Sequence, residues 1–249
     1  MTDKVTTVKI YTNQRSPHLF KSKFLEFLTK SHPAVIDIMY GIIAFFLMRF
    51  YFNHYGAGNP TGNGDGIAAI SLQFLYGFLS WSLAEYLMHR FLYHKPSDAT
   101  YDDGIQYLFH GIHHYFPDDT SRTVLPPVPS LGIASLFFGL FWLVIGKYAF
   151  TYGAGFMMGY CAYMTVHYIL HKVPPPKGFS WWWNFHNIHH YQQHDRAFGV
   201  TSPIWDYVFH TMPEEGRRTV IIEVAKPGEE FVKKHMKDAP QEENTPEKK

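Results

Sequence analysis

Four long runs of apolar residues constrain the fold more than any other feature of this sequence. They cover residues 34–52, 67–88, 131–150 and 153–170, and each has about the length of a helix that crosses a lipid bilayer. Within each run the apolar residues lie on all sides of the expected helix and do not form a single stripe. This pattern favours contact with lipid over burial in a soluble helical bundle. We therefore expect an all-α integral membrane protein with four transmembrane helices.

The distribution of positive charge predicts how these helices are oriented. Residues 1–33 carry six Lys or Arg and most of the others lie in 89–130 and 172–249, whereas the 51–66 loop carries none. Basic segments stay on the cytoplasmic side of a membrane. Both termini and the 89–130 segment should therefore face the cytosol.

Polar segments flank the apolar core on both sides. Residues 1–33 are expected to form a cytosolic segment with an amphipathic helix at 20–30, which lies in the membrane interface or packs on the protein. The apolar residues that would share one face of this helix are Phe20, Phe24, Phe27 and Leu28. Residues 34–225 should form the membrane domain with a histidine-rich cap, and the charged residues 226–249 a disordered tail.

Charge and cysteine content exclude several classes of function. The net charge is only +1, so no overall field attracts nucleic acid. The single cysteine, Cys161, lies in an apolar run, which excludes a disulfide framework and a cysteine-based metal site. No word that would bind a haem, a flavin or a dinucleotide occurs in the chain.

Histidine is the anomalous residue type, with sixteen copies, of which ten lie in four short groups. Residues i, i+3 and i+4 share one face of a helix, so each His-x-x-His-His word should present three imidazoles together. The pair His167 and His171 should do the same with two. His89 and His94 are five residues apart and would diverge on a regular helix, so we expect a helix end between them. The ten histidines are His89, His94, His110, His113, His114, His167, His171, His186, His189 and His190.

Such a cluster of imidazoles indicates metal binding. Imidazoles repel one another when they are protonated and need partners when they are neutral, and a metal ion satisfies neutral imidazole. Ten ligand nitrogens exceed one coordination sphere, which implies two metal ions. The remaining histidines are expected to be ordinary surface or structural residues, with a supporting role open for His194. They are His18, His32, His54, His194, His210 and His235.

Two other features near the histidines have two interpretations each. Glu85 lies one turn before His89 and could orient it by accepting the second N–H of its ring, or it could simply reach the membrane interface. The residues Trp181, Trp182 and Trp183 are typical of a membrane-interface belt, and could instead line a substrate site.

The spacing of the four histidine groups resembles that of the integral-membrane fatty acid hydroxylase and sterol desaturase superfamily. The words around them are similar to those of fatty acid 2-hydroxylases: HRFLYH (89–94), FHGIHHYFPDDTSRTVLPP (109–127), GYCAYMTVHYILH (159–171) and GVTSPIWDYVFHT (199–211). The resemblance covers roughly residues 20–213 and implies that the ten histidines are metal ligands. It also implies loop-shaping or supporting roles for matching residues, which are Pro117, Asp119, Arg122, Pro126 and Pro127, and it matches Trp205, Asp206 and Phe209.

The chain departs from this family pattern in two respects. Relatives usually have Asp and Thr where this chain has Met164 and Val166, so an acid and a hydroxyl are missing beside the third histidine pair. Fungal and animal relatives also carry an N-terminal haem domain of the cytochrome b5 type, whose His-Pro-Gly-Gly word is absent here. An external electron donor, cytochrome b5-like or ferredoxin-like, with its reductase is therefore expected.

The resemblance implies an oxidoreductase of the monooxygenase type. We expect it to hydroxylate C2 of a fatty acid, or of the acyl chain of a sphingolipid or ceramide, with two iron ions and O2. Zinc can replace iron in such a site after purification. No catalytic residue beyond the metal ligands is predicted. The membrane would be the endoplasmic reticulum in a eukaryote or the inner membrane in a bacterium, with the active site on the cytosolic face.

Two alternatives remain open at this point. One is a desaturase, or a hydroxylase of a sterol, a carotenoid or another lipid, from the same superfamily. The other is a membrane protein that binds or transports metal without oxidative chemistry. A transporter would hold its ligands near the bilayer midplane, whereas these histidines lie at the ends of the apolar runs.

Overall fold

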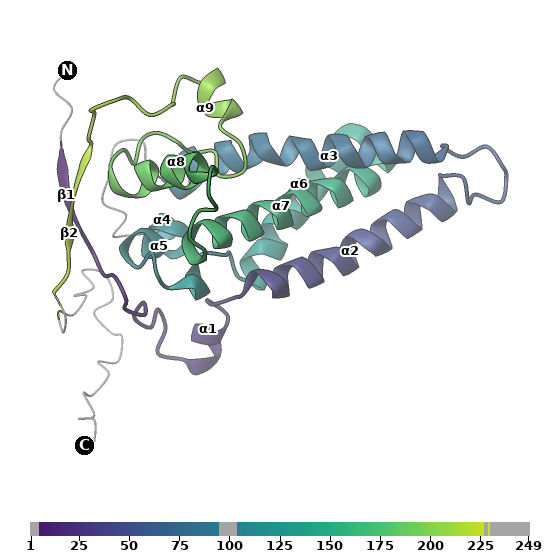
Figure 1. The fold of residues 1–249 in the computed structure, drawn as a ribbon. Helices are drawn as coiled ribbons and strands as arrows, with labels where there is room; N and C mark the ends of the chain where they lie inside the picture. The colour runs from purple at the N-terminus through teal and green to yellow at the C-terminus, as the bar shows by residue number, and fades with distance from the viewer. Residues whose placement is uncertain (1–4, 95–103, 227–228, 230–249) are drawn as a thin grey trace.

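The computed structural model describes residues 5–94, 104–226 and 229, and within them the chain is mostly helical (Figure 1). The helices are α1 (Lys23–Phe27), α2 (Pro33–His54), α3 (Ile67–Leu87), η1 (Met88–Tyr93), α4 (Gly104–Gln106), η2 (Tyr107–Gly111), α5 (Ile112–Tyr115), η3 (Thr120–Arg122), α6 (Pro127–Ile145), η4 (Gly146–Tyr148), α7 (Ala149–Lys172), α8 (Ser180–Tyr191) and α9 (Ile204–Val208). Two strands complete the fold, β1 (Thr6–Ile10) and β2 (Val220–Val224).

The four long helices α2, α3, α6 and α7 lie side by side and form the elongated part of the molecule (Figure 1). They coincide with the four predicted apolar runs. By length and hydropathy, the described residues contain three segments that are able to cross a membrane, Pro33–His54, Ile67–Tyr93 and Thr120–Lys172. The third segment holds both α6 and α7, because the short helix η4 joins them without a long polar loop.

The turn between α6 and α7 lies earlier than the sequence pattern indicated. We expected the third run to continue to residue 150, but α6 ends at Ile145 and α7 begins at Ala149. Gly146 ends α6 with a φ of 55°, a left-handed conformation that glycine adopts without strain. The start is earlier too, because Pro127 occupies the first helical position, where its fixed φ suits a helix.

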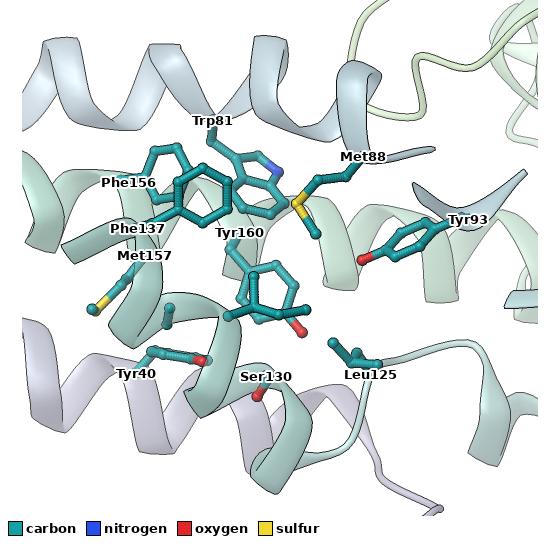
Figure 2. Close-up of a pocket in the computed structure, with 12 residues that line it drawn as sticks. Tyr40, Trp81, Met88, Tyr93, Leu125, Ser130, Phe137, Phe156, Met157 and Tyr160 are labelled. Atoms are coloured by element: carbon teal, nitrogen blue, oxygen red, sulfur yellow. The ribbon is translucent and has the colours of Figure 1, made fainter. Parts of the chain in front are cut away.

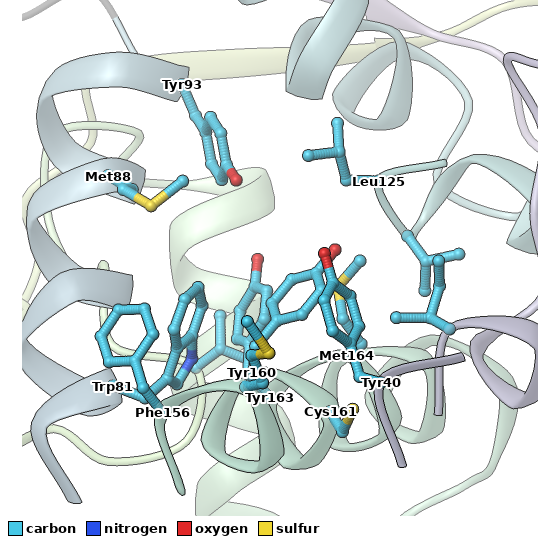
Figure 3. Close-up of a cluster of buried hydrophobic side chains, with 14 of the residues drawn as sticks. Tyr40, Trp81, Met88, Tyr93, Leu125, Phe156, Tyr160, Cys161, Tyr163 and Met164 are labelled. Carbon is cyan, nitrogen blue, oxygen red and sulfur yellow. The ribbon is translucent and has the colours of Figure 1, made fainter. Parts of the chain in front are cut away.

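Helix α7 is the centre of this bundle and packs against α2, α3 and α6. The backbones of α3 and α7 touch at glycines. A Cβ atom added to Gly77 would lie 1.9 Å from the carbonyl oxygen of Tyr152, and one added to Gly155 would lie 1.9 Å from that of Phe74. Small residues allow this close approach, which membrane helices use for packing. Large aromatic side chains fill the rest of the core, among them Tyr40, Trp81 and Tyr160 (Figure 3).

A small parallel sheet was not expected from the sequence. It lies beside the histidine-rich end of the helical bundle, which we call the cap. Strand β1 pairs with β2 in parallel, from Thr6 opposite Val220 to Ile10 opposite Val224. The two strands come from opposite ends of the described chain, so no local hairpin pattern in the sequence predicts them. The sheet is attached to the cap where the ring of Tyr11 stacks on that of Phe116 at 5.0 Å.

The predicted interfacial helix at 20–30 is shorter than expected and spans only α1. Its Phe24 and Phe27 are exposed, as predicted, but Glu26 is buried. The Glu26 carboxylate accepts the backbone N–H of Leu19 at 2.7 Å, which folds the preceding chain back and prevents an earlier helix start. Of the predicted disordered tail, residues 227–228 and 230–249 lie outside the described residues.

Candidate metal centre

All ten histidines singled out from the sequence meet at the cap end of the long helices, in two groups of five. Within each group, one ring nitrogen per residue lies within 4.8 Å of those of the other members. Nine of the ten are buried and His171 is partly buried. We call the two groups site 1 and site 2. Site 1 consists of His89, His94, His110, His114 and His189, and site 2 of His113, His167, His171, His186 and His190.

Each His-x-x-His-His word contributes to both sites. His110 and His114, at i and i+4, belong to site 1, while His113 between them belongs to site 2. In the second word the roles are reversed, since the i and i+4 residues serve site 2 and His189 serves site 1. Viewed down the helix axis, the side chain of residue i+3 lies to one side of that of residue i, and the side chain of residue i+4 lies to the other side. Each word therefore spans the gap between the two groups, which the sequence analysis did not foresee.

The pair His89 and His94 meets in site 1, and the helix end that we expected between them lies at Tyr93, with His94 in an extended conformation just after it. Residues Met88–Tyr93 form the π-helix η1, in which the N–H of His94 lies 3.2 Å from the carbonyl oxygen of His89. A π-turn contains one more residue than an α-turn, so side chains five positions apart come to one face. The expected helix end is therefore confirmed, but the π-turn before it, which the sequence analysis did not foresee, is what brings the two side chains together.

The distances between ring nitrogens fit metal ions. In site 1 the Nε2 atom of His110 lies 3.0 Å from those of His89 and His114. Two nitrogens bound at right angles to one ion, each about 2.1 Å from it, lie roughly 3.0 Å apart. In site 2 the Nε2 atoms of His167 and His190 are buried and have no hydrogen-bond partner. Each group therefore presents several inward nitrogens that a metal ion would satisfy.

Backbone carbonyls fix the orientation of three of these rings. The Nδ1 atom of His89 lies 2.6 Å from the carbonyl oxygen of Phe198, and that of His189 lies 2.7 Å from the carbonyl oxygen of Arg196. In site 2 the Nδ1 atom of His167 lies 3.1 Å from the carbonyl oxygen of Thr123. A carbonyl accepts a hydrogen bond only from a protonated Nδ1, which leaves the Nε2 lone pair free for a metal.

Glu85 fits neither of the two interpretations that the sequence left open, since it is buried and contacts the backbone of residues 200–201. It accepts no hydrogen bond from His89. Its carboxylate accepts the N–H groups of Val200 and Thr201 at 2.6 and 2.8 Å, and the hydroxyl of Thr201 at 2.5 Å. The ring of His89 is directed at the carbonyl of Phe198, so the acid supports the loop that carries this carbonyl and not the ring itself.

The electrostatics of the centre keep the imidazoles neutral. Burial, together with the neighbouring histidines, lowers the pKa of His110, His113 and His114 well below the usual value of 6.5. The same causes lower the pKa of the three histidines of the last word, His186, His189 and His190. Neutral imidazole is the form that binds metal. The folded protein thus holds its donors ready near neutral pH.

An apolar pocket extends from the centre into the helical bundle (Figure 2). At its cap end, Met88 precedes His89 in the chain and Tyr93 precedes His94, and the ring of Tyr93 stacks on that of His110 at 5.5 Å. Phe156 and Met157 of α7 line the other end. Its lining is almost wholly apolar, which suits an acyl chain better than a polar substrate.

The residues that the family resemblance added lie around the two sites. Asp119 and Arg122 are buried, and the Arg122 guanidinium donates to the Glu26 carboxylate at 2.7 Å. Asp206 is also buried and accepts the N–H groups of Phe198 and Gly199. The buried side chain of Met164 belongs to the apolar core and supplies no acid there.

His54, His194 and two of the tryptophans have structural partners. The Nε2 atom of His194 lies 2.7 Å from the carbonyl oxygen of His190, which makes it a neighbour of the centre outside both groups. The Nδ1 atom of His54 lies 2.8 Å from the carbonyl oxygen of Phe50, at the far end of α2. Trp182 and Trp183 donate their indole N–H groups to backbone carbonyls, whereas Trp181 is half exposed. His235 lies outside the described residues.

The sequence analysis missed the segment between α8 and α9. Phe198 and Arg196 support the rings of site 1 through their carbonyl oxygens. Any residue type provides a carbonyl, so these two positions carry no chemical signal in the sequence. The only available indication was the word at 199–211, which begins one residue later.

Comparison with known proteins agrees with this geometry. The sequence model of the fatty acid hydroxylase family matches residues 74–211, a region that contains all ten histidines.

The chain belongs to the fatty acid hydroxylase family.

Two curated relatives illustrate how much of the chain is shared within the fatty acid hydroxylases. The human fatty acid 2-hydroxylase is 34% identical over 222 residues, which cover 81% of this chain and 58% of the human protein. The dihydroceramide fatty acyl 2-hydroxylase of Arabidopsis thaliana is 31% identical, over 79% of this chain and 80% of the plant protein. The chain thus spans well under two thirds of the length of the mammalian relatives it matches.

A solved structure from the same family has the same fold. It is that of full-length Scs7p, in which only the hydroxylase domain is visible, and it aligns with a TM-score of 0.68 at 28% identity. The alignment covers 79% of this chain and 72% of the other. The superfamily that the histidine spacing indicated is therefore confirmed.

Proposed function

We propose that this protein is a membrane-bound monooxygenase that hydroxylates C2 of a fatty acid, or of the acyl chain of a ceramide. The observation that carries the proposal is the position of two five-histidine groups at the cap end of an apolar pocket. The names of the relatives, fatty acid 2-hydroxylase and dihydroceramide fatty acyl 2-hydroxylase, support the choice of carbon and of substrate class.

The ten histidines would hold two iron ions, one in each group. A redox-active metal supplies, with O2 and two electrons, the oxidising chemistry that an inert alkyl C–H bond requires, which zinc cannot supply. The chain contributes the surroundings of this reaction. Carbonyl oxygens orient His89, His167 and His189, and burial keeps their neighbours neutral. The apolar walls of the pocket exclude water and align the substrate chain.

The arrangement of the pocket supports reaction near the carboxyl end of the substrate. Tyr93 and Met88 line the cap end of the pocket. They lie at the end of the apolar segment Ile67–Tyr93, beside the site 1 histidines His89 and His94. An acyl chain that enters from the bilayer with its polar end toward the cap presents its first carbons there. Reaction in the middle of the chain would require many more carbons to pass the metals.

We further propose that α2, α3, α6 and α7 are four transmembrane spans and that the centre faces the cytosol. The outer face of α6 is open and apolar, since Leu136, Leu143 and Val144 are 74%, 83% and 74% exposed. Such a surface is stable only in lipid or against another apolar surface. Electrons would come from a cytochrome b5-like or ferredoxin-like donor with its reductase, in the endoplasmic reticulum of a eukaryote or the inner membrane of a bacterium.

Labelled dioxygen tests this function directly. The purified protein, loaded with iron, is given a saturated fatty acid or ceramide, a reductase, an electron carrier and 18O2. We expect one labelled hydroxyl at C2 by mass spectrometry, and no product from NAD(P)H without the carrier. The H113A variant should be inactive and H54A, outside the centre, should be active. A mid-chain double bond, a hydroxylated sterol or carotenoid, or metal binding without any product would contradict the proposal.

A further inference from the structure

The segment between α8 and α9 contacts the histidines of one metal site and not of the other. The carbonyls of Arg196 and Phe198 face His189 and His89, both members of site 1. The ring of Phe198 also lies 5.7, 5.6 and 5.5 Å from the rings of the three site 1 histidines His89, His94 and His189. We call residues 196–201 the support loop.

Two buried carboxylates hold the support loop in place. Glu85 of α3 is 3% exposed and accepts three hydrogen bonds from Val200 and Thr201. Asp206 of α9 is fully buried and accepts the N–H of Phe198 at 2.9 Å and the N–H of Gly199 at 2.7 Å. Both oxygens of a carboxylate accept hydrogen bonds, and its charge strengthens them, whereas an amide of the same shape is neutral and accepts through one oxygen only.

The backbone of the support loop depends on this clamp. Ala197, between the two residues whose carbonyls face the rings, has a φ of 56°, a conformation that is uncommon for any residue except glycine. A Cβ atom at Gly199 would lie 2.1 Å from the carbonyl oxygen of Ser202. The support loop is therefore tightly folded where its carbonyl oxygens face the histidine rings.

Site 2 has a separate support at the other side of the centre. The ring of His167 faces the carbonyl of Thr123. The preceding residue, Arg122, donates to the Glu26 carboxylate at 2.7 Å and to the hydroxyl of Ser16 at 2.7 Å. The N-terminal segment, and neither Glu85 nor Asp206, thus fixes the carbonyl that orients a site 2 ligand.

We propose that Glu85 and Asp206 are positioning residues for metal site 1 alone, and that the two metal ions can be lost independently. The inference rests on the metal binding in the proposed function. Partners that orient a ligating histidine typically contribute 10–100-fold in metal affinity. Loss of the clamp would leave His89 and His189 without their fixed orientation, while the five nitrogens of site 2 keep theirs.

Metal content of the full-length protein tests the proposal. E85Q and D206N keep the size of each side chain and remove its charge. We expect each variant to retain about one metal ion after dialysis where the unmodified protein retains two, and to bind the lost ion roughly 10–100-fold more weakly. E223Q is the matched control, because Glu223 is exposed on β2, pairs with Lys9 and belongs to neither histidine group. T201V, which removes one of the donors to Glu85, should give a smaller loss in the same direction.

Combination with ligand variants identifies the site that is affected. E85Q added to H167A, which disables site 2, should leave no bound metal. E85Q added to H94A, which already disables site 1, should cause no further loss. A variant that lost both ions together, or that added its loss to that of H94A, would overturn the proposal. So would E85Q and D206N proteins that keep two ions.

Misfolding and failure of the proposed function give different results. The unfolding temperatures of the metal-free E85Q and unmodified proteins should be compared. A general loss of folding would lower this temperature as well as the metal content of both sites. If the unmodified protein itself binds no metal, the proposed function fails. If it binds two and E85Q binds the same two, only the positioning role fails.

Discussion

The two adjacent residues His113 and His114 serve different metal sites. His113 belongs to site 2, where its Nε2 atom lies 3.0 Å from that of His171. His114 belongs to site 1, where its Nε2 atom lies 3.0 Å from that of His110. Successive side chains on a helix point about 100° apart, so one turn can supply ligands to two ions that lie on either side of it. One His-x-x-His-His word therefore contributes histidines to both groups.

Single replacements in this word should separate the sites. We expect H113A to lose the metal of site 2 and H114A that of site 1, so that each binds about one ion, while the double variant retains at most a weakly bound one. Metal analysis of the purified proteins measures this, with H54A as the histidine control because His54 lies outside both groups. Full metal content in the double variant would refute the assignment of these residues as ligands.

The lowered pKa values of the buried histidines predict acid sensitivity of the metal-free protein. In the unfolded chain a histidine binds a proton below about pH 6.5, whereas in the folded protein His110, His114 and His186 bind it only at much lower pH. The unfolded state therefore takes up more protons as the pH falls, and stability decreases below about pH 6.5.

Thermal unfolding of the metal-free protein at pH 7.5, 6.5 and 5.5 measures this effect. Each shifted histidine contributes about 1.4 kcal/mol per pH unit below its unfolded pKa. A variant in which His113 and His114 are both replaced by Gln should lose less stability between pH 6.5 and 5.5. An unchanged or higher unfolding temperature at pH 5.5 would contradict the neutral state of the cluster.

At the scale of the elements, the position of the metal centre depends on how closely α3 approaches α7. Helix α3 continues into η1, which carries His89 and His94, and α7 carries His167 and His171. The two helices touch backbone to backbone at Gly77 and Gly155. Any increase in their separation would move ligands of site 1 away from those of site 2.

Glycine-to-alanine changes test this contact. G77A should destabilise the fold by about 1–3 kcal/mol, because the added methyl group would overlap the carbonyl oxygen of Tyr152 at 1.9 Å. G139A on α6 is the matched control, since a Cβ atom there meets nothing within 4 Å and alanine favours a helix by about 1 kcal/mol. Unfolding in detergent compares the two variants. Equal stability of G77A and G139A would contradict the close packing.

At the scale of the whole molecule, the centre lies at one end of an elongated apolar bundle and the loop 55–66 lies at the other (Figure 1). The cap carries the basic segments, and Lys147 is the single lysine or arginine between residues 131 and 171. This asymmetry is the basis of the proposed orientation. In the proposed orientation the centre would face the cytosol, where the proposed electron donor would reach it.

Site-directed labelling tests the orientation. The single native cysteine, Cys161, is buried, so an introduced cysteine reports its own position. In sealed membrane vesicles, N63C should react with an impermeant reagent only from the outer face and K177C only from the cytosolic face. Asn63 and Lys177 are both exposed, so accessibility is not limited by the fold. Reaction of both from the same side would contradict the three spans, α3, α6 and α7, that the proposed topology places between them.

The sequence by itself determined the long helices and the ten candidate ligands, because both are local properties. Apolar runs of bilayer length and the spacing of histidines can be recognised within a few turns of chain, and α2, α3 and α7 begin and end close to the expected residues. Only the tertiary structure decided how the histidines divide between the two sites, since the division depends on where distant helices place their faces. The tertiary structure alone also revealed three other features. They are the π-turn at His89–His94, the sheet of β1 with β2, and the carbonyls of Phe198 and Arg196. Each is formed or stabilised by backbone groups, which every residue type carries, and by partners far away in the chain.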